Sequence, residues 1–200
     1  IYISSFSSSN NFPTTLGSFQ NNNAGNQDVV VFKFDNNLSQ LLWSTYLGSS
    51  GNDAGYGIRV NNNLETYITG VASNNFPMNQ FSSLINFNGG IYDGFIIKLN
   101  QNGSQILESC YYGSNGNDES FFIDIDKEDN IYIYGQNTGY IQPSNNVYSV
   151  NNSRQFIAKL DENLNQILWQ TTVGSGSIFS YDFVPIAFMV DLCKDGYIVK

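Results

Sequence analysis

The chain has 200 residues, and its hydrophobic content of 41% and aromatic content of 15% are sufficient for a buried core. The net charge of −9, with only eight Lys and Arg spread along the chain, argues against a nucleic-acid partner and against an anionic membrane surface, because both require clustered cations. No apolar run approaches the ~20 residues that span a bilayer, and no histidine is present for His-based triads or His-ligated metals.

A repeat organises the whole sequence. Segment 48–70, GSSGNDAGYGIRVNNNLETYITG, returns at 113–135 as GSNGNDESFFIDIDKEDNIYIYG, with the same Gly-Asn-Asp turn and a closing Tyr-Ile-x-Gly. A fixed period of this kind indicates a repeat architecture. Four tyrosines mark the period of 65 residues: Tyr2, Tyr67, Tyr132 and Tyr197.

Each repeat contains four short runs that are rich in β-branched and aromatic residues and bounded by Gly, Asn and Ser clusters, which is typical of strands. One run per repeat is almost continuously apolar, interrupted by a single lysine whose stem can lie along the sheet, and such a run predicts a strand covered on both faces. In chain order the expected strands are 2–3, 29–34, 41–47, 58–60, 67–71, 95–99, 106–112, 121–125, 132–135, 156–160, 167–173, 186–190 and 197–198.

A four-stranded antiparallel sheet that is covered on both faces is a propeller blade. The long polar loop takes about 20 residues of each period, which leaves about 45 residues for the strands, as in an ordinary blade. We therefore predict an all-β chain that forms part of a β-propeller, with four-stranded antiparallel blades of about 65 residues. The expected units are the end of a blade at 1–55, full blades at 56–112 and 120–173, and the start of a blade at 183–200, with further blades supplied by the same longer chain.

The repeated motifs resemble a known family. Tyr-Ile-Thr-Gly at 67–70, Asn-Phe-Pro at 11–13 and 75–77, Asp-Gly-Phe-Ile-Ile-Lys-Leu-Asn at 93–100 and Leu-Leu-Trp-Ser-Thr-Tyr-Leu-Gly at 41–48 resemble the SBBP family of bacterial β-propeller repeats, with NHL-like blades. The resemblance covers all three repeats and is closer in the first two. It implies a propeller of the seven-bladed type in a secreted or cell-surface bacterial protein. The Asn-rich, Lys-poor composition is similar to cargo of the type IX secretion and gliding apparatus of Bacteroidetes.

The repeat separates scaffold from function, because a blade needs its structural residues in every period whereas a ligand needs its residues once. Asp53 and Asp118, in the Gly-Asn-Asp turns, recur, and so do Asp28 and Asp93, five residues before the strand lysines. A short Asp side chain accepts backbone N–H bonds in tight turns. We therefore interpret these four aspartates as scaffold.

Three carboxylates are candidates for a metal site: Asp124, Asp126 and Asp129 alternate as at the start of an EF-hand loop, which would bind calcium. The segment lacks the central Gly and the distal Glu of such a loop. It also stands where residues 61–65 form a hairpin turn in the preceding repeat. The favoured interpretation is a hairpin turn, with no cofactor.

The third repeat departs from the other two. Four residues move from its long loop to the turn after 167–173, and Arg154 stands where Asp28 and Asp93 stand in the first two repeats. Alternating strands place the loops at 5–27, 72–92 and 136–153 on one face, together with that turn. The candidate binding residues on this face are Arg154, Phe179, Tyr181, Asp182, Tyr92 and Tyr140.

Long polar loops with aromatic side chains on a rigid scaffold are a common recognition surface. We expect a non-catalytic protein interaction or adhesion module, secreted or on the bacterial cell surface. The alternative is a glycan-binding propeller, because aromatic and amide side chains occur together in the loops. The second alternative is a propeller hydrolase or lyase whose site lies in other blades.

Overall fold

The computed structural model describes the chain except for residues 80–83, 85, 178–185, 192–195 and 200, and it describes residues 191 and 196–199 by their backbone. The described part is all β, with every pair of neighbouring strands antiparallel, which confirms the predicted fold class at this level. It contains no helix that could cross a membrane.

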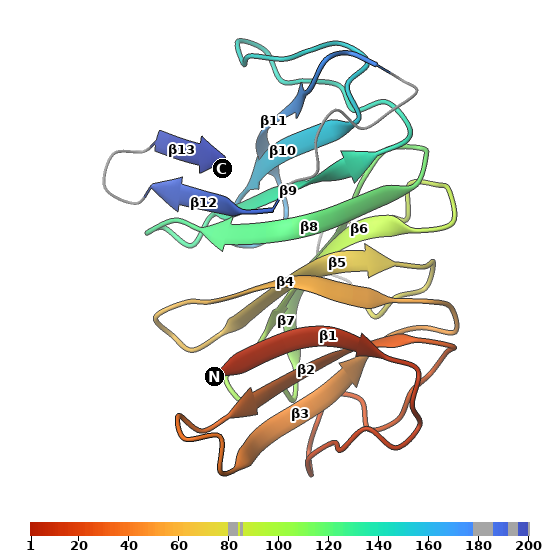
Figure 1. The fold of residues 1–200 in the computed structure, drawn as a ribbon, viewed down its shortest axis with the longest axis vertical. Coiled ribbons are helices and arrows are strands. Elements are labelled where there is room, and N and C mark those ends of the chain that lie inside the picture. Colours follow the sequence, from red (N-terminus) through yellow and green to blue (C-terminus); the bar gives the residue numbers. More distant parts are fainter. Residues whose placement is uncertain (80–83, 85, 178–185, 192–195, 200) are drawn as a thin grey trace.

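The strands form four sheets in which each strand pairs with the next in the chain (Figure 1). The first sheet has three strands, β1 (Tyr2–Ser7), β2 (Asp28–Phe34) and β3 (Leu41–Leu47). The second has four, β4 (Ala54–Val60), β5 (Thr66–Ala72), β6 (Asp93–Leu99) and β7 (Ile106–Tyr112). The third has β8 (Asp118–Ile125), β9 (Ile131–Asn137), β10 (Gln155–Leu160) and β11 (Ile167–Val173), and the last has β12 (Phe188–Asp191) and β13 (Gly196–Val199).

The first strands of the second and third sheets begin earlier than the expected 58–60 and 121–125. β4 starts at Ala54, directly after its Gly-Asn-Asp turn, and β8 starts at Asp118, the last residue of its turn. The first residues of β4 are alanine and glycine, and those of β8 include Asp118, and such residues have low strand propensity. The backbones of β4 and β5 approach so closely that a Cβ on Gly70 would lie 1.9 Å from the carbonyl oxygen of Ala54. The pairing of β4 with β5 therefore depends on glycine.

The sheets stack along the long axis of the molecule, with β1 in contact with β4, β4 with β8 and β8 with β12 (Figure 1). Each pair of adjacent sheets encloses its own apolar cluster. In β6, Phe95 and Ile97 pack in the cluster shared with the first sheet, whereas Ile96 packs in the cluster shared with the third. Successive residues of a strand face opposite sides, so β6 is buried on both faces, as its continuous apolar sequence predicts.

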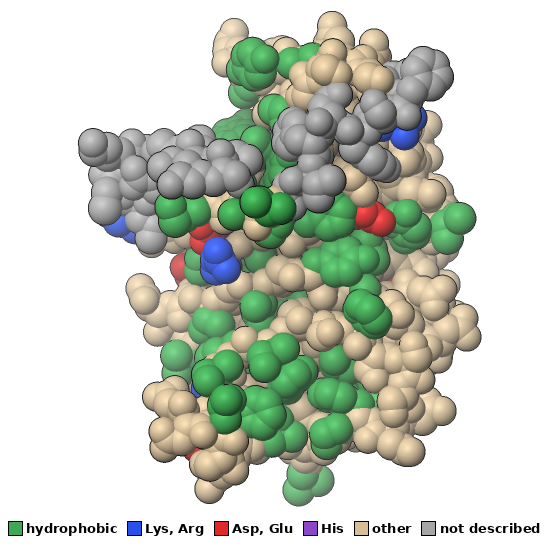
Figure 2. All heavy atoms as spheres, viewed as in Figure 1, with side chains coloured by type: hydrophobic (Ala, Val, Ile, Leu, Met, Phe, Trp, Pro, Cys, Tyr) green, Lys and Arg blue, Asp and Glu red, His purple; other side chains and the backbone are tan. Residues whose placement is uncertain are grey.

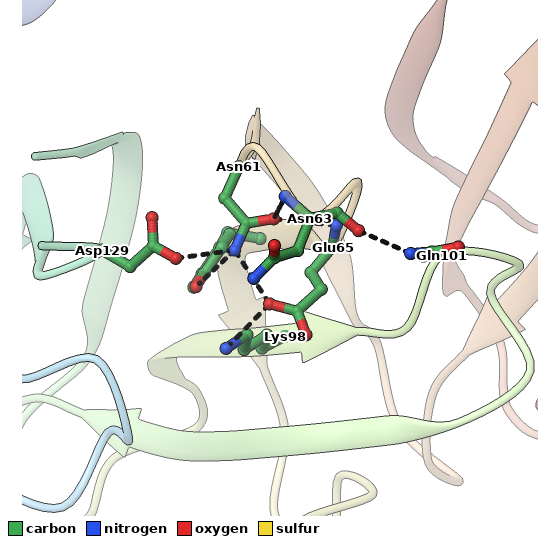
Figure 3. Close-up of polar contacts among 7 residues, drawn as sticks. Asn61, Asn63, Glu65, Lys98, Gln101 and Asp129 are labelled. Carbon is green, nitrogen blue, oxygen red and sulfur yellow. Dashed lines mark hydrogen bonds and ion pairs between the residues drawn. The ribbon is translucent and has the colours of Figure 1, made fainter. Parts of the chain in front are cut away.

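The strand lysines lie at the ends of the sheets where the short turns are. Lys98 Nζ is 3.0 Å from Glu65 Oε2 and lies over the ring of Tyr67, and Lys159 Nζ is 2.9 Å from Asp126 Oδ2. Neighbouring turns are also joined across the sheets, because the amide of Asn61 donates to both Glu65 and Asp129 (Figure 3). The ion pairs of these two lysines, two of the three among the described residues, therefore lie at this end of the sheets.

The long loops lie along the outer strands rather than projecting freely. The loop after β1 bonds to β3, with the amide N–H of Thr15 donating to the carbonyl of Ser44. The loop after β9 bonds to β11 in the same way, through Ser144 to Gln170 and Val150 to Thr172. An outer strand with free backbone groups is a site for unwanted pairing, and these loops cover it. Part of their length is therefore structural.

Candidate functional site

The Gly-Asn-Asp aspartates hold the connections between the sheets. The Asp53 carboxylate accepts hydrogen bonds from the backbone N–H and the hydroxyl of Ser49 and from the same two groups of Ser73, at 2.7–3.1 Å. Asp118 accepts the corresponding bonds from Ser114. Asp53 and Asp118 are both fully buried. Buried carboxylates with these donors are turn anchors, as the repeat indicated.

A second carboxyl group lies beside each of these anchors. Asp28, at the start of β2, accepts from Gln20 and the N–H of Ala24, and it faces Asp53 across the sheet junction. Asp93, at the start of β6, lies close enough to Asp118 for the second carboxylate to raise its pKa. The sequence assigned these residues to turns but did not indicate that they would form pairs.

The Asp93–Asp118 pair is buried, and one of its atoms lacks a hydrogen-bond donor in the described part of the chain. Among the described residues, no N–H or O–H group reaches Oδ1 of Asp93, which is sealed from solvent. Burial, with the neighbouring carboxylate, raises the pKa of Asp93 from 3.8 to about 7, and burial raises that of Asp118 to about 6. Because both residues are buried, their raised pKa values make the stability of this junction depend on pH.

The candidate calcium residues have separate partners. Asp124 pairs with Arg59 at 2.9 Å and accepts the N–H of Val190, whereas Asp126 binds Lys159. Asp129 accepts the amide of Asn61 in the contact between turns (Figure 3). Segment 126–130 is the hairpin turn between β8 and β9. Within the described part of the chain, no group of three or more His, Cys, Asp or Glu side chains is placed to hold a metal ion.

Two tyrosines anchor the long loops of the first two repeats. The hydroxyl of Tyr46, in β3, donates to the carbonyl of Ser9 and accepts the N–H of Phe12. At the same position in β7, Tyr111 donates to Ser73 at 2.9 Å and accepts the N–H of Phe76 at 2.9 Å. Both rings are buried, so each fills the space between its outer strand and its loop.

In the third repeat this position is Thr172, and a pocket opens there. Pairing with the preceding strand establishes the equivalence, since Val30 lies opposite Tyr46, Phe95 opposite Tyr111 and Phe156 opposite Thr172. The pocket has a volume of about 290 Å³, and we call it the Arg154 pocket. Its lining residues are Thr138, Gly139, Tyr140, Ile141, Asn152, Ser153, Arg154 and Thr172.

The structure therefore brings together two of the residues proposed from the sequence. Arg154 and Tyr140 line the same pocket, although they lie at opposite ends of one loop. Tyr92 lies elsewhere, at the junction of the second and third sheets, where its carbonyl accepts the N–H of Asp118. The other three, Phe179, Tyr181 and Asp182, lie outside the described residues.

Sequence reasoning missed Thr172. The signal was present, because Tyr46 and Tyr111 recur at the end of the outer strand and the third repeat breaks the pattern. A tyrosine replaced by threonine is a weaker signal in the sequence than an aspartate replaced by Arg154, because only the second change reverses a charge. Only the folded chain shows that the two changes meet in one place.

Tyr140 and Ile141 also line a second pocket of about 210 Å³, towards the loop of the second sheet. Tyr112, Gln142 and Gln170 contribute to its wall, and the hydroxyl of Tyr112 donates to the Gln170 amide oxygen at 3.0 Å. The Tyr140 side chain is 60% exposed, so its ring is available to a ligand on the rim. The two pockets are thus neighbours that share one aromatic residue.

No protein-family model matches this chain, and no curated protein matches it either.

Proposed function

We propose that the four sheets are consecutive blades of a β-propeller of the SBBP type, completed by further blades of the same longer chain. Three features support this proposal. The complete sheets are four-stranded meanders, their first strands follow one another in contact, and each pair of sheets encloses a separate core. On the side of the molecule that Figure 2 shows, hydrophobic side chains gather over the sheets around β1 and β4. We expect such side chains on surfaces that face other blades.

The propeller acts as a non-catalytic interaction or adhesion module of a secreted or bacterial cell-surface protein. The observation that carries this proposal is the set of exposed apolar side chains on loops that are fixed to the sheets. A rigid loop presents a contact side chain with little loss of conformational entropy on binding. The exposed large apolar side chains in the described parts of the long loops 5–27, 72–92 and 136–153 are Phe6, Leu16, Phe19, Ile91, Tyr140 and Tyr148, of which Phe6 lies within β1. The resemblance to SBBP repeats supports the location, and type IX secretion is the proposed route.

Substitution tests this proposal better than loop deletion, because a deletion would uncover the edges of β3, β7 or β11. Replacing Leu16, Ile91 and Tyr148 with serine removes apolar contact area while leaving the backbone bonds of the loops intact. We expect capture of the protein partner from the cell surface to fall by about tenfold or more, since a few central residues dominate most interfaces.

The matched control lies on the short turns. Leu38 and Leu64 are exposed and have φ values of 56° and 61°, where asparagine is better accommodated than leucine. The double variant L38N/L64N removes exposed apolar area from the opposite end of the sheets and should bind as the original does. Equal binding by the loop variant and this control would contradict the proposed recognition surface.

Glycan recognition is the second candidate function. The Arg154 pocket favours it, because amide and hydroxyl side chains line a cavity with an exposed aromatic ring on its rim. A glycan array probed with the intact propeller tests this candidate. Silence across neutral and acidic glycans would exclude it.

A further inference from the structure

The third repeat differs from the first two at two positions that line one pocket. Arg154 replaces the buried aspartates Asp28 and Asp93, and Thr172 replaces the buried tyrosines. One change removes a large ring, and the other replaces a carboxylate with a guanidinium. Because both changes alter the Arg154 pocket, they act together: the first supplies space and the second supplies charge.

The remaining contacts keep the pocket open without the tyrosine. The loop that forms its wall is fixed to β11 by the N–H of Val150, which donates to the carbonyl of Thr172, and by the Thr172 hydroxyl, which donates back to Val150 at 2.9 Å. The backbone of Arg154 is also fixed, because its carbonyl accepts the N–H of Asn137. The wall therefore does not depend on a side chain that fills the cavity.

Arg154 is placed differently from the other described cations. The strand lysines and Arg59 lie near the ends of strands that run towards the short turns, and Lys127 lies in one of those turns. Arg154 lies just before β10, at the end of the sheet where the long loops emerge, and it makes no ion pair with any described acid. A guanidinium without an acid partner can bind a carboxylate through two parallel hydrogen bonds.

The rest of the lining specifies the remainder of the ligand. Asn152 supplies an amide, and the hydroxyls of Ser153, Thr138 and Thr172, which already bond to Gly176, Asn117 and Val150, keep lone pairs that can accept hydrogen bonds. None of the described lining residues carries a carboxylate. The volume of about 290 Å³ lies just below the ~300–1,000 Å³ of small-molecule sites, which suits a single sugar ring. The exposed ring of Tyr140 suits the apolar face of a sugar, and its second side lines the neighbouring pocket.

We propose that the Arg154 pocket binds one acidic sugar unit, a uronic acid, of a longer polysaccharide. In this arrangement Arg154 binds the carboxylate, the amide and hydroxyl side chains bind the sugar hydroxyls, and the chain continues past Tyr140 into the second pocket. The inference rests on the second candidate function, glycan recognition, and names its substrate class. An acidic peptide is the competing ligand, but it would leave the neutral hydrogen-bonding groups and the second pocket without a role.

Calorimetric titration of the intact protein with an oligouronate tests the proposal, with a neutral oligosaccharide of equal length and an acidic peptide as comparisons. R154Q removes the charge and the guanidinium and leaves a shorter, neutral side chain that still forms hydrogen bonds. T172Y restores the tyrosine that the first two repeats already accommodate, and so fills the pocket. We expect each substitution to weaken oligouronate binding by about tenfold or more, because each removes a whole class of contact.

The matched control is R59Q, which removes one positive charge near the short turns and should bind the oligouronate as the original does. Unchanged binding by R154Q would overturn the proposal, as would absence of oligouronate binding or equal binding of the acidic peptide. Should T172Y fail to fold, R154Q and the peptide comparison still decide the matter. Absence of oligouronate binding, with loop-dependent capture of the protein partner retained, would overturn this inference and leave the interaction module standing.

Discussion

The second and third sheets have the same strand order, yet the spaces between their outer strands and their long loops are organised in opposite ways. In the second sheet Tyr111 fills the space and holds the loop, and Asp93 closes the loop end as half of a buried acid pair. In the third sheet Thr172 and Arg154 occupy these positions and line an open pocket. With the same strand order, the third sheet therefore has an open pocket where one ring is lost and one carboxylate is replaced by a guanidinium.

The space that Tyr111 fills in the second sheet contributes to stability, whereas the open pocket of the third sheet lacks this contribution. Tyr46 and Tyr111 bury an aromatic ring and satisfy two backbone groups of the loop each. Thr172 buries less, and its hydroxyl makes a local bond to Val150. The sheet keeps its register in both cases because the strand ladder, rather than the filler, sets the pairing.

The largest expected effect comes from removing the tyrosine that fills the space between strand and loop in the second sheet. Tyr111→Thr would leave a cavity and remove the hydroxyl that binds Ser73 and Phe76, so the free energy of unfolding should fall by about 3–5 kcal/mol. Denaturant unfolding of the intact protein measures this. Tyr148→Thr, at an exposed loop position, is the control and should change stability by less than about 0.5 kcal/mol. A loss below about 1 kcal/mol for Tyr111→Thr would show that the tyrosine is not what closes this space.

The acid pair should make the second junction sensitive to pH. Because the pKa of Asp93 is raised to about 7 and that of Asp118 to about 6, the folded chain binds more protons than the unfolded chain between about pH 4 and 7. The stabilisation that comes from the protonated acid pair is fully present below about pH 4 and is lost as the pH rises through about 7. Asp93→Asn keeps a donor towards Asp118 and removes one titrating group, so it should raise the free energy of unfolding at pH 8 by about 2 kcal/mol.

The same variant provides an internal control, since near pH 4 both the original and Asp93→Asn have a neutral side chain at this position and should be equally stable. Thermal unfolding across the pH range distinguishes the outcomes. A constant difference at all pH values would contradict the raised pKa of Asp93 and indicate a packing effect instead.

The strands and the fold class were predictable because the repeat samples the same pattern three times. The apolar runs with a single lysine located β2, β6 and β10, and the polar turns located their ends. The beginning of β4 was not predictable from propensity, because Gly55 is required there by a tertiary contact. A Cβ on Gly55 would lie 2.2 Å from the hydroxyl oxygen of Ser4.

The candidate site was predictable only in part. Arg154 and Tyr140 were identified because they do not recur, but nothing local relates them to Thr172, which lies on another strand. The pairing of Asp93 with Asp118 was missed for the same reason, since one begins β6 and the other begins β8. Contacts between sheets depend on how the sheets stack, and the residues of a single repeat do not encode that stacking.

The smallest expected effect comes from filling the Arg154 pocket of the third sheet. Thr172→Tyr fills a pocket that opens to solvent, so the ring gains little burial, and the Val150–Thr172 backbone bond already holds the loop there. The free energy of unfolding should therefore change by less than about 1 kcal/mol, in contrast with the loss from Tyr111→Thr at the equivalent position. Chemical unfolding of the two variants side by side measures this asymmetry. A stabilisation by Thr172→Tyr as large as the loss from Tyr111→Thr would mean that the pocket is a packing defect, whereas little change combined with lost ligand binding would mean that it is open for recognition.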